Sequence, residues 1–371
     1  MSGKMKTRTN FHFTYLISCT PVMPSCTSGL PFEKHNKLFF DLTMQRTANQ
    51  IGLRKCGPLG NTHILVDFLG EGGFGVVTKC ISTVTGTEVA IKVNKNRPHI
   101  FNQARREIEI LKRLRGLDPD TCNIVKWNGF FFHKENICLN FELLDKSLHD
   151  YRVHRRNANL SMRELRPVIH QLATALSHLS SKQIVHADLK PENVMVVDST
   201  QQQIRVRLID FGLAHPRFGT DPGACVQTTW YRAPEVIIQL PFDEAIDMWS
   251  LGLTIVEMAT GYPMYPGDTE YDVLRYIVET QGQPPDHMLD NTEDPSDKRL
   301  LLDLIKRMLE LDPVQRIKPL EVLQHPFLTH SLEGADDGIL QLLAQPIATL
   351  LTEELATVVS TAMISHKLHE N

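Results

Sequence analysis

The sequence lacks the cysteine pattern of a disulfide-bonded secreted domain or of a zinc site. Its seven cysteines are an odd number, lie far apart between positions 19 and 225, and include no C-x-x-C pair. Such cysteines are typical of free thiols in a reducing compartment. We therefore expect an intracellular protein, either nuclear or cytoplasmic.

Long apolar runs are also absent. No stretch approaches the about 20 residues that a membrane-spanning helix requires. Cations precede the apolar stretch 11–17, as in a secretory signal peptide, but His12 and Thr14 interrupt that stretch. The sequence therefore predicts neither a membrane-spanning segment nor a signal peptide.

Charge of one sign is not in large excess. The 43 acidic and 39 basic residues leave a formal net charge of -4, which creates no overall field that attracts nucleic acid or an anionic membrane. The hydrophobic content of 42% is ordinary for a soluble globular protein, and 371 residues are enough for one large domain or two smaller ones. We expect no direct nucleic-acid partner and no membrane partner.

The sequence changes character near residue 61. Residues 1–60 mix Ser, Thr, Pro, Gly and Asn without sustained periodicity, which predicts a flexible extension without its own core. A helix is expected over 102–115, because Ile108, Leu111 and Leu114 recur at helical spacing. Strands are expected in the β-rich segments 64–66, 76–81, 88–93 and 137–141. A small sheet with one helix is thus the predicted first lobe, about 61–144.

Helical periodicity dominates after Asp145. Ser161 and Glu164 match a capping box, although Pro167 is an alternative first turn. The stretch 243–260 is apolar around most of its circumference, which predicts a central buried helix that Gly261 ends. A further helix is expected over 297–311. The prediction is an α+β domain over 61–330, with a helical second lobe at about 145–330, a site between the lobes, and a partly helical tail over 331–371.

A glycine-rich run lies between the first two predicted strands. It reads Gly70-Glu71-Gly72-Gly73-Phe74-Gly75-Val76-Val77, and a dinucleotide-binding turn would instead open a helix. Bare backbone allows close approach to phosphate, and Val77 would close over a flat base. An ordinary glycine-rich hairpin is the alternative.

Lys92 lies in the apolar strand 88–93 that follows. A lysine among apolar residues needs an anion, because desolvation of its charge is costly. Glu107 is the favoured partner, since it lies one helical turn before Leu111, and Glu109 is the less favoured one. A solvent-facing strand lysine is the alternative for Lys92 taken alone.

The run from His186 to Asn193 carries three chemical groups at the spacing that phosphoryl transfer uses. Asp188 would orient an attacking hydroxyl and accept its proton, Lys190 would neutralise charge on the phosphoryl group, and Asn193 would bind magnesium. Asp210 ends the next apolar strand and is the second predicted magnesium ligand.

With these motifs in order, the sequence resembles the eukaryotic protein kinases over about 64–328. The resemblance implies the bilobal kinase fold, ATP and Mg2+ as cofactors, and transfer of a phosphoryl group to a protein hydroxyl. It implies a hinge at Glu142, Leu143 and Leu144, and an ion pair between Glu235 and Arg316 that braces the peptide-binding segment. The nucleotide contacts that it implies are Gly70, Glu71, Gly72, Gly73, Phe74, Gly75, Val77, Ala90, Lys92, Glu107, Phe141 as gatekeeper, Glu142, Leu144, Met195 below the base, and Asp210.

Among kinases, the sequence is similar to the homeodomain-interacting protein kinases and their dual-specificity tyrosine-regulated relatives. The similarity lies in His186-Ala187-Asp188, with alanine in place of arginine, in 241–252, and in 262–267 through Gly282. It implies Ser/Thr substrates, often before proline, and Arg232 after Tyr231 is the arginine associated with that preference.

The chain departs from these families where regulation is expected. Cys225 stands where the autophosphorylated tyrosine would lie, and Thr229 stands where an arginine would receive the phosphate. Because a phosphotyrosine orders a loop only when cations pair with it, we expect a segment ordered by packing, with Trp230 involved. The stretch 282–298 is also shorter than the insert of the relatives, so an insert-based docking surface is not expected.

Two other functions compete with an active protein kinase. A kinase-fold scaffold without activity remains open because of Cys225 and Thr229, whereas retention of Lys92, Asp188 and Asp210 favours the enzyme. A small-molecule phosphotransferase is disfavoured by the peptide-kinase segment 233–235 and the helix around Trp249. Protein substrates are thus the expected partners, and the oligomeric state is left open.

Overall fold

The structure of the chain is a computed structural model that describes residues 58–153, 155, 159–218, 224–280 and 296–329. The chain divides into two units, Met1–Arg46 and Thr47–Asn371, and every described residue belongs to the second. Most of the predicted extension 1–60, the tail 331–371 and the greater part of 282–298 lie outside the described residues. Within the described part, no helix is long and apolar enough to cross a membrane.

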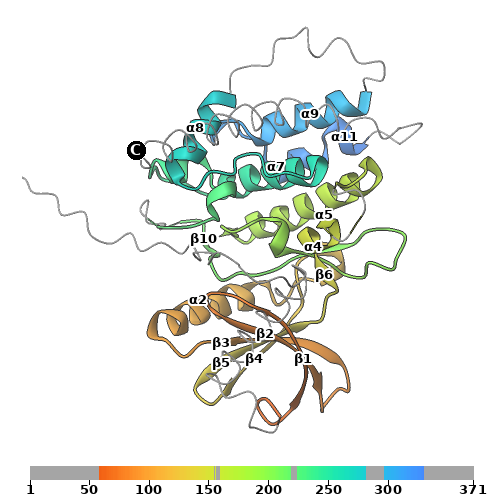
Figure 1. Ribbon diagram of the computed structural model, residues 1–371, viewed down its shortest axis with the longest axis vertical. Coiled ribbons are helices and arrows are strands. Elements are labelled where there is room, and N and C mark those ends of the chain that lie inside the picture. Colours follow the sequence, from red (N-terminus) through yellow and green to blue (C-terminus); the bar gives the residue numbers. More distant parts are fainter. Residues whose placement is uncertain (1–57, 154, 156–158, 219–223, 281–295, 330–371) are drawn as a thin grey trace, which may run out of the picture. The chain divides into compact units, whose positions relative to one another are not determined.

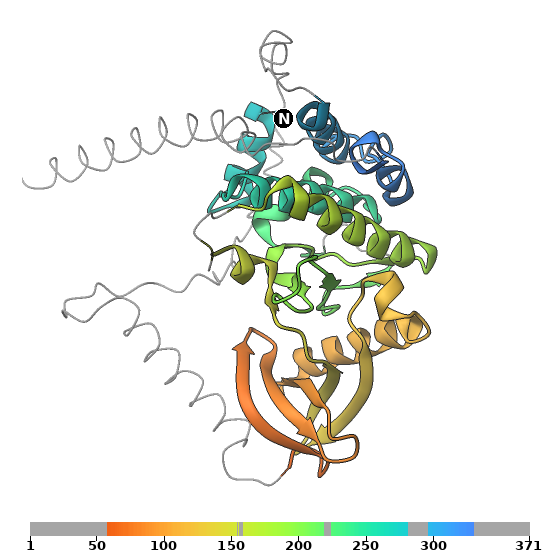
Figure 2. The ribbon, with the colours of Figure 1, turned by 90° about the vertical axis from the view of Figure 1, so that its right-hand side faces the viewer.

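The first lobe is an antiparallel sheet with one long helix beside it (Figures 1 and 2). The strand order is β1-β2-β3-β5-β4. Alternation places Val89, Ile91 and Val93 in the core of the lobe, as the pattern predicts. The strands are β1 (His63–Glu71), β2 (Gly75–Ser82), β3 (Glu88–Asn94), β4 (Trp127–His133) and β5 (Asn136–Glu142).

Strand β4 was not predicted, because Asn128 and Gly129 interrupt its strand-forming residues. The helix of this lobe, α2 (Pro98–Leu114), begins earlier than the predicted residue 102, since proline is favoured in a first helical turn. Its apolar stripe is buried and packs on β3 and β5. A short helix, α3 (Pro119–Cys122), connects α2 to β4.

The second lobe is mainly helical, and α7 runs through its centre. All residues of α7 from Ile246 to Thr260 are buried, and Gly261 ends the helix in the left-handed conformation with φ 85°. A Cβ at Gly252 would lie 2.9 Å from a methyl group of Leu309, so this glycine allows the close approach of the C-terminal end of α9 (Ser296–Met308). The helices are α4 (Leu148–Val153), α5 (Met162–Ser181), α6 (Pro234–Ile237), α7 (Ala245–Thr260), α8 (Glu270–Thr280), α9 (Ser296–Met308), α10 (Pro319–Leu323) and α11 (Pro326–Thr329).

The first residue of α5 distinguishes the two predicted helix starts, the capping box at Ser161 and the first turn at Pro167. Glu164 Oε2 accepts hydrogen bonds from the backbone N–H and the hydroxyl of Ser161, at 3.0 and 2.8 Å. The capping box at Ser161 is therefore confirmed, and the alternative start at Pro167 is wrong, because Pro167 lies inside the helix. Helix α9 ends at Met308, before the predicted residue 311.

Short strands position the loops between the two lobes. They form a sheet in the order β6-β8-β9 and a pair of β10 with β7. The run His186–Asn193 connects β7 to β8, and Asp210 follows β9. The elements are β6 (Lys146–Ser147), β7 (Ile184–Val185), η1 (Pro191–Asn193), β8 (Val194–Val196), β9 (Val206–Leu208), β10 (His215–Pro216) and η2 (Thr229–Tyr231).

Candidate active site

A cavity of about 260 Å³ lies where the sheet meets the β8–β9 region. Most of its lining belongs to residues predicted to contact a nucleotide, and three lining residues, Leu69, Val125 and Ile209, were not predicted. Leu69 and Ile209 directly precede the predicted Gly70 and Asp210, so their position beside the motifs was a usable signal. The predicted residues in the lining are Gly70, Val77, Ala90, Lys92, Glu107, Phe141, Glu142, Leu143, Leu144, Met195 and Asp210.

The glycine-rich turn joins β1 to β2 beside this cavity. The predicted contacts Glu71, Gly72, Gly73, Phe74 and Gly75 do not line the cavity itself. A Cβ at Gly75 would lie 2.2 Å from the carbonyl oxygen of Val93, so only glycine fits there. A Cβ at Gly72 or Gly73 would meet no atom within 4 Å, so open space adjoins their backbone. The local geometry is that of a hairpin whose tip has room for a ligand.

Lys92 joins two carboxylates that come from different parts of the chain. Its Nζ lies 2.9 and 3.0 Å from the two carboxylate oxygens of Glu107 on α2, and 2.8 Å from Asp210 Oδ1. The predicted pairing with Glu107 is confirmed, whereas Glu109 pairs with Lys112 at 2.8 Å on the exposed side of α2. The contact with Asp210 was not predicted.

Burial and charge compete in this cluster. Burial alone would lower the pKa of Lys92, but the attraction of Asp210 and Glu107 outweighs it and raises that pKa. Burial would raise the pKa of Asp210, yet the Lys92 ammonium lowers it. For Glu107 burial prevails and raises the pKa. One ammonium thus pairs with two carboxylates at the edge of the cavity.

A second cluster lies in the loop between β7 and β8. Asp188 Oδ2 accepts hydrogen bonds from Lys190 Nζ at 3.0 Å and from Asn193 Nδ2 at 2.9 Å. Asn193 Nδ2 also donates to the backbone oxygen of Asp188 at 2.8 Å. The three residues predicted to carry the chemistry are therefore brought together around one carboxylate.

Thr228 completes this cluster, and the sequence reasoning gave it no structural role. Its hydroxyl donates to Asp188 Oδ1 at 2.7 Å and accepts from Lys190 Nζ at 2.6 Å. The signal available in the sequence was only a hydroxyl residue shortly before Ala233-Pro234-Glu235. Both oxygens of Asp188 thus have fixed partners, which orients the carboxylate.

Comparison with known proteins agrees with this geometry. The profile of the family described as "Protein kinase domain" matches residues 64–328. The chain belongs to the protein kinase family. Its sheet with α2 and its helical second lobe form the bilobal kinase fold, as predicted.

Among curated proteins, this kinase is similar to the homeodomain-interacting protein kinases. It is 37% identical to homeodomain-interacting protein kinase 2 of Mesocricetus auratus over 332 residues, with 72% of this chain and 28% of the relative covered. It is 44% identical over 236 residues to homeodomain-interacting protein kinase 1 of Caenorhabditis elegans, with 64% of this chain and 28% of the relative covered. It is 42% identical over 229 residues to homeodomain-interacting protein kinase 4 of Mus musculus, with 61% of this chain and 37% of the relative covered. The chain thus spans about 28% of the length of the first two relatives.

Ala187, the residue that replaces the usual arginine in the kinase loop, is fully buried. Asp247 of α7 accepts the backbone N–H groups of His186 and Ala187 at 2.7 and 2.8 Å. Burial raises the pKa of Asp247. Ala187 has a positive φ of 61°, a strained conformation that these two hydrogen bonds hold in place. The backbone of the loop is therefore fixed from α7 without an arginine side chain.

Residues 224–231, which contain Cys225 and Thr229 and are called the activation segment below, are anchored mainly by Gln227. Its side chain is buried, donates to Ile246 O at 3.0 Å and Ser250 Oγ at 2.8 Å, and accepts from the N–H of Ala233 at 3.0 Å. Trp230, which was expected to take part in packing, is 41% exposed and donates its indole N–H to Gly267 O at 2.9 Å. Trp230 is therefore an edge contact, and sequence reasoning missed the anchor Gln227.

Arg232 and Tyr231 connect the segment to helices α8 and α7 of the second lobe. The buried Arg232 guanidinium donates to the backbone oxygens of Val226 and Gln227 at 2.9 and 2.7 Å, and it pairs with Glu270 of α8. The buried Tyr231 hydroxyl donates to Glu257. Burial and the neighbouring Glu257 carboxylate raise the pKa of this phenol.

The ion pair between Glu235 and Arg316 is present, as the resemblance implies. Arg316 Nη1 and Nη2 lie 2.7 and 3.1 Å from the two oxygens of Glu235, and both side chains are buried. The guanidinium carbon also lies 5.2 Å from the centroid of the Trp249 ring. This bidentate pair connects the segment after Ala233 to the loop before α10.

Proposed function

We propose that the chain is an ATP- and Mg2+-dependent protein kinase that phosphorylates Ser or Thr, with a preference for proline after the acceptor. The single observation that carries the proposal is the position of Lys92 Nζ, 2.9 Å from Glu107 and 2.8 Å from Asp210, at the edge of an apolar cavity. This arrangement suits a base in the cavity and phosphates beside the ammonium.

The Asp188 cluster supports proton transfer and charge neutralisation at the acceptor. Asp188 orients the attacking hydroxyl and takes its proton, while Lys190, held 3.0 Å away, offsets negative charge on the transferred group. Thr228 holds both residues in this geometry through its hydroxyl. Because these side chains are fixed before substrate arrives, little reorganisation accompanies the reaction.

The side-chain oxygens of Asn193 and Asp210 are suitable ligands for a magnesium ion. Both hydrogens of the Asn193 amide face Asp188, so its carbonyl oxygen remains as a ligand. Asp210 Oδ1 accepts hydrogen bonds from Lys92 Nζ and from the backbone N–H of Gly212. Among the described residues, none donates a hydrogen bond to Asp210 Oδ2. Oxygen ligands from one carboxylate and one amide, completed by phosphate and water, are the surroundings that Mg2+ prefers. Bound there, the ion would offset the negative charge of the phosphates.

The backbone at Gln227 supports the proline preference. Gln227 has a positive φ of 63°, and its carbonyl oxygen accepts a hydrogen bond from Arg232 Nη2 at 2.7 Å. A carbonyl used in this way is unavailable to the backbone N–H of the residue after the acceptor. Proline has no such N–H and leaves no donor unsatisfied on binding.

The test uses the purified full chain with Mg-ATP and two peptides that differ only in Ser-Pro against Ser-Ala. We expect phosphorylation of both, with kcat/KM at least about fivefold higher for Ser-Pro, since one unsatisfied donor costs about 1–3 kcal/mol. Asp188→Asn should abolish transfer, whereas Asp198→Asn, in the turn between β8 and β9, should not. Arg232→Ala should reduce the preference for Ser-Pro.

Two outcomes contradict the proposal. If the parent chain transfers no phosphate but binds an ATP analogue, the kinase-fold scaffold is supported instead. If both peptides react equally, the preference for proline is wrong although the kinase activity stands.

A further inference from the structure

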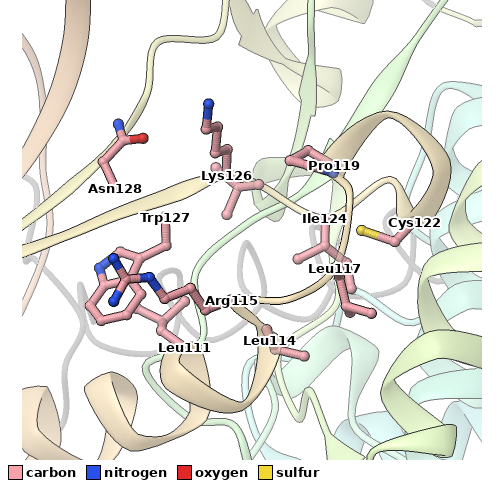
Figure 3. A pocket seen from close by; sticks show the side chains of 11 residues that line it. Leu111, Leu114, Arg115, Leu117, Pro119, Cys122, Ile124, Lys126, Trp127 and Asn128 are labelled. Atoms are coloured by element: carbon pink, nitrogen blue, oxygen red, sulfur yellow. The ribbon is translucent and has the colours of Figure 1, made fainter.

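A second cavity, of about 300 Å³, shares one lining residue, Val125, with the candidate nucleotide cavity. Figure 3 shows Leu111 and Leu114 on one side of it, Lys126 and Asn128 on the opposite side, and the Arg115 guanidinium beside the Trp127 indole. Its size falls at the lower end of the range for small-molecule sites. The lining residues are Leu111, Leu114, Arg115, Leu117, Pro119, Cys122, Ile124, Val125, Lys126, Trp127 and Asn128.

The charge of this lining is one-sided. Two cations, Arg115 and Lys126, belong to the lining, and no acidic residue does. The acids nearby are engaged by other groups, since Asp120 binds Arg205 and Arg207, Asp118 accepts the backbone N–H of Asp120, and Glu142 accepts the backbone N–H of Lys126. Among the described residues, neither the Arg115 guanidinium nor the Lys126 ammonium has an ion pair. The rim therefore carries positive charge above an apolar wall.

The wall also contains a donor without an acceptor. Trp127 is only 9% exposed, and among the described residues its indole N–H has no hydrogen-bond partner. The Arg115 guanidinium carbon lies 6.0 Å from the centroid of the Trp127 ring. A buried donor left unsatisfied is unfavourable, and an anion beside Arg115 would offer it an acceptor.

We propose that this cavity is a binding site for a small carboxylate with an apolar body, such as a medium-chain fatty acid. The carboxylate lies beside the Arg115 guanidinium and the Trp127 indole, the Lys126 ammonium adds positive charge to the lining, and the apolar body lies against Leu111, Leu114 and Ile124. Charge complementarity selects an acid over an alcohol or an amine of the same length. This site is separate from the nucleotide cavity and does not depend on catalysis.

The position of the cavity couples it to the proposed active site. Leu111 follows Glu107 by one turn of α2, so a ligand against Leu111 holds the helix that carries the partner of Lys92. Ile124 and Val125 of the lining belong to the segment 123–125, which exchanges backbone hydrogen bonds of 2.9 and 3.1 Å with Leu208, two residues before Asp210. Both carboxylates that bind Lys92 are therefore attached to walls of this cavity.

The coupling rests on the proposed function, whereas the binding site does not. Because linkage is reciprocal, a carboxylate that holds both walls raises the affinity for nucleotide by the same factor by which nucleotide raises the affinity for the carboxylate.

The test is calorimetric titration of the full chain with octanoate, octanol and octylamine. Octanoate should bind at least about tenfold more tightly than either uncharged or cationic probe, since charged hydrogen bonds are worth 1.5–3 kcal/mol. The double variant Arg115→Gln/Lys126→Gln should lose at least tenfold in octanoate affinity. Arg106→Gln, which changes an exposed arginine of α2 outside the cavity, is the control and should bind as the parent does.

Each alternative result has a defined meaning. Equal binding of octanoate and octanol, or octanoate binding that the double variant does not weaken, overturns the site. Binding of an acidic leucine-rich peptide without octanoate binding also overturns it and indicates a protein-docking surface. Octanoate binding that leaves the affinity for an ATP analogue unchanged overturns the coupling but not the binding site. The peptide-phosphorylation assay tests the proposed kinase activity independently of the octanoate site and of the coupling.

Discussion

The backbone N–H of Gln227 donates a hydrogen bond to the carbonyl oxygen of Ala187 at 2.8 Å. This bond connects the activation segment to the loop that carries Asp188, and both residues are buried. This contact joins the two segments through neutral backbone atoms alone. The packing-held segment expected from Cys225 and Thr229 thus has a structural counterpart, although its anchor is Gln227 and not Trp230.

Gln227→Ala should destabilise the domain and lower its activity. The change leaves the N–H of Ala233 and the carbonyl of Ile246 without their buried partners, so we expect the free energy of unfolding to fall by about 2–4 kcal/mol. Urea denaturation measures this. Gln239→Ala is the matched control, because Gln239 has a similar positive φ of 57° but is exposed. Equal losses in the two variants would show that backbone strain, and not the buried amide, dominates.

Glu107→Gln should reduce phosphoryl transfer by about 100-fold, because one carboxylate no longer holds the Lys92 ammonium in place. Steady-state kinetics with Mg-ATP measure the change in kcat/KM. Glu109→Gln, two residues along the same helix, removes only an exposed pair with Lys112 and should act as the parent does. Similar activity in both variants would contradict the assignment of Glu107.

Arg316→Met should lower the free energy of unfolding by about 3–5 kcal/mol, because it leaves the Glu235 carboxylate buried and uncompensated. The control is Arg307→Met, which removes a pair with Asp303 of similar length, 2.9 Å, but on the exposed surface. That loss should be below about 1 kcal/mol. Thermal and chemical unfolding of the two variants test the contrast, and a small effect at Arg316 would refute it.

Thiol labelling should separate the cysteines of the described residues. Burial raises the pKa of Cys138 to about 12, and burial also raises the pKa of Cys80 and Cys122. The thiolate is the reactive form, so a raised pKa leaves almost none of it at pH 8, and these three should resist iodoacetamide. Exposed Cys225 should react, and Cys225→Ser should remove that label. Peptide mapping after labelling of the folded chain checks this, and fast labelling of Cys138 would contradict its burial.

Local patterns predicted four strands of the first sheet and the helices α2, α5, α7 and α9, because each depends on residues close together in the sequence. The capping box at Ser161, the all-round apolar stretch of α7 and the glycine at 261 are features of this kind. Predictions were less accurate where the pattern was mixed, as in β4, and at helix ends such as that of α9. Motif spacing also placed Asp188, Lys190 and Asn193 together, since a single short loop carries all three.

The sequence by itself thus determined the fold class, indicated the residues that we propose to carry the chemistry, and favoured Glu107 over Glu109 as the partner of Lys92. Only the tertiary structure decided that Lys92 also meets Asp210, 118 residues away, that Thr228 orients Asp188, and that Gln227 anchors the activation segment. The second cavity likewise exists only where α2, α3 and β4 pack together. The reason is physical: periodicity and spacing report on neighbours along the chain, whereas contacts between distant segments depend on how the complete core packs.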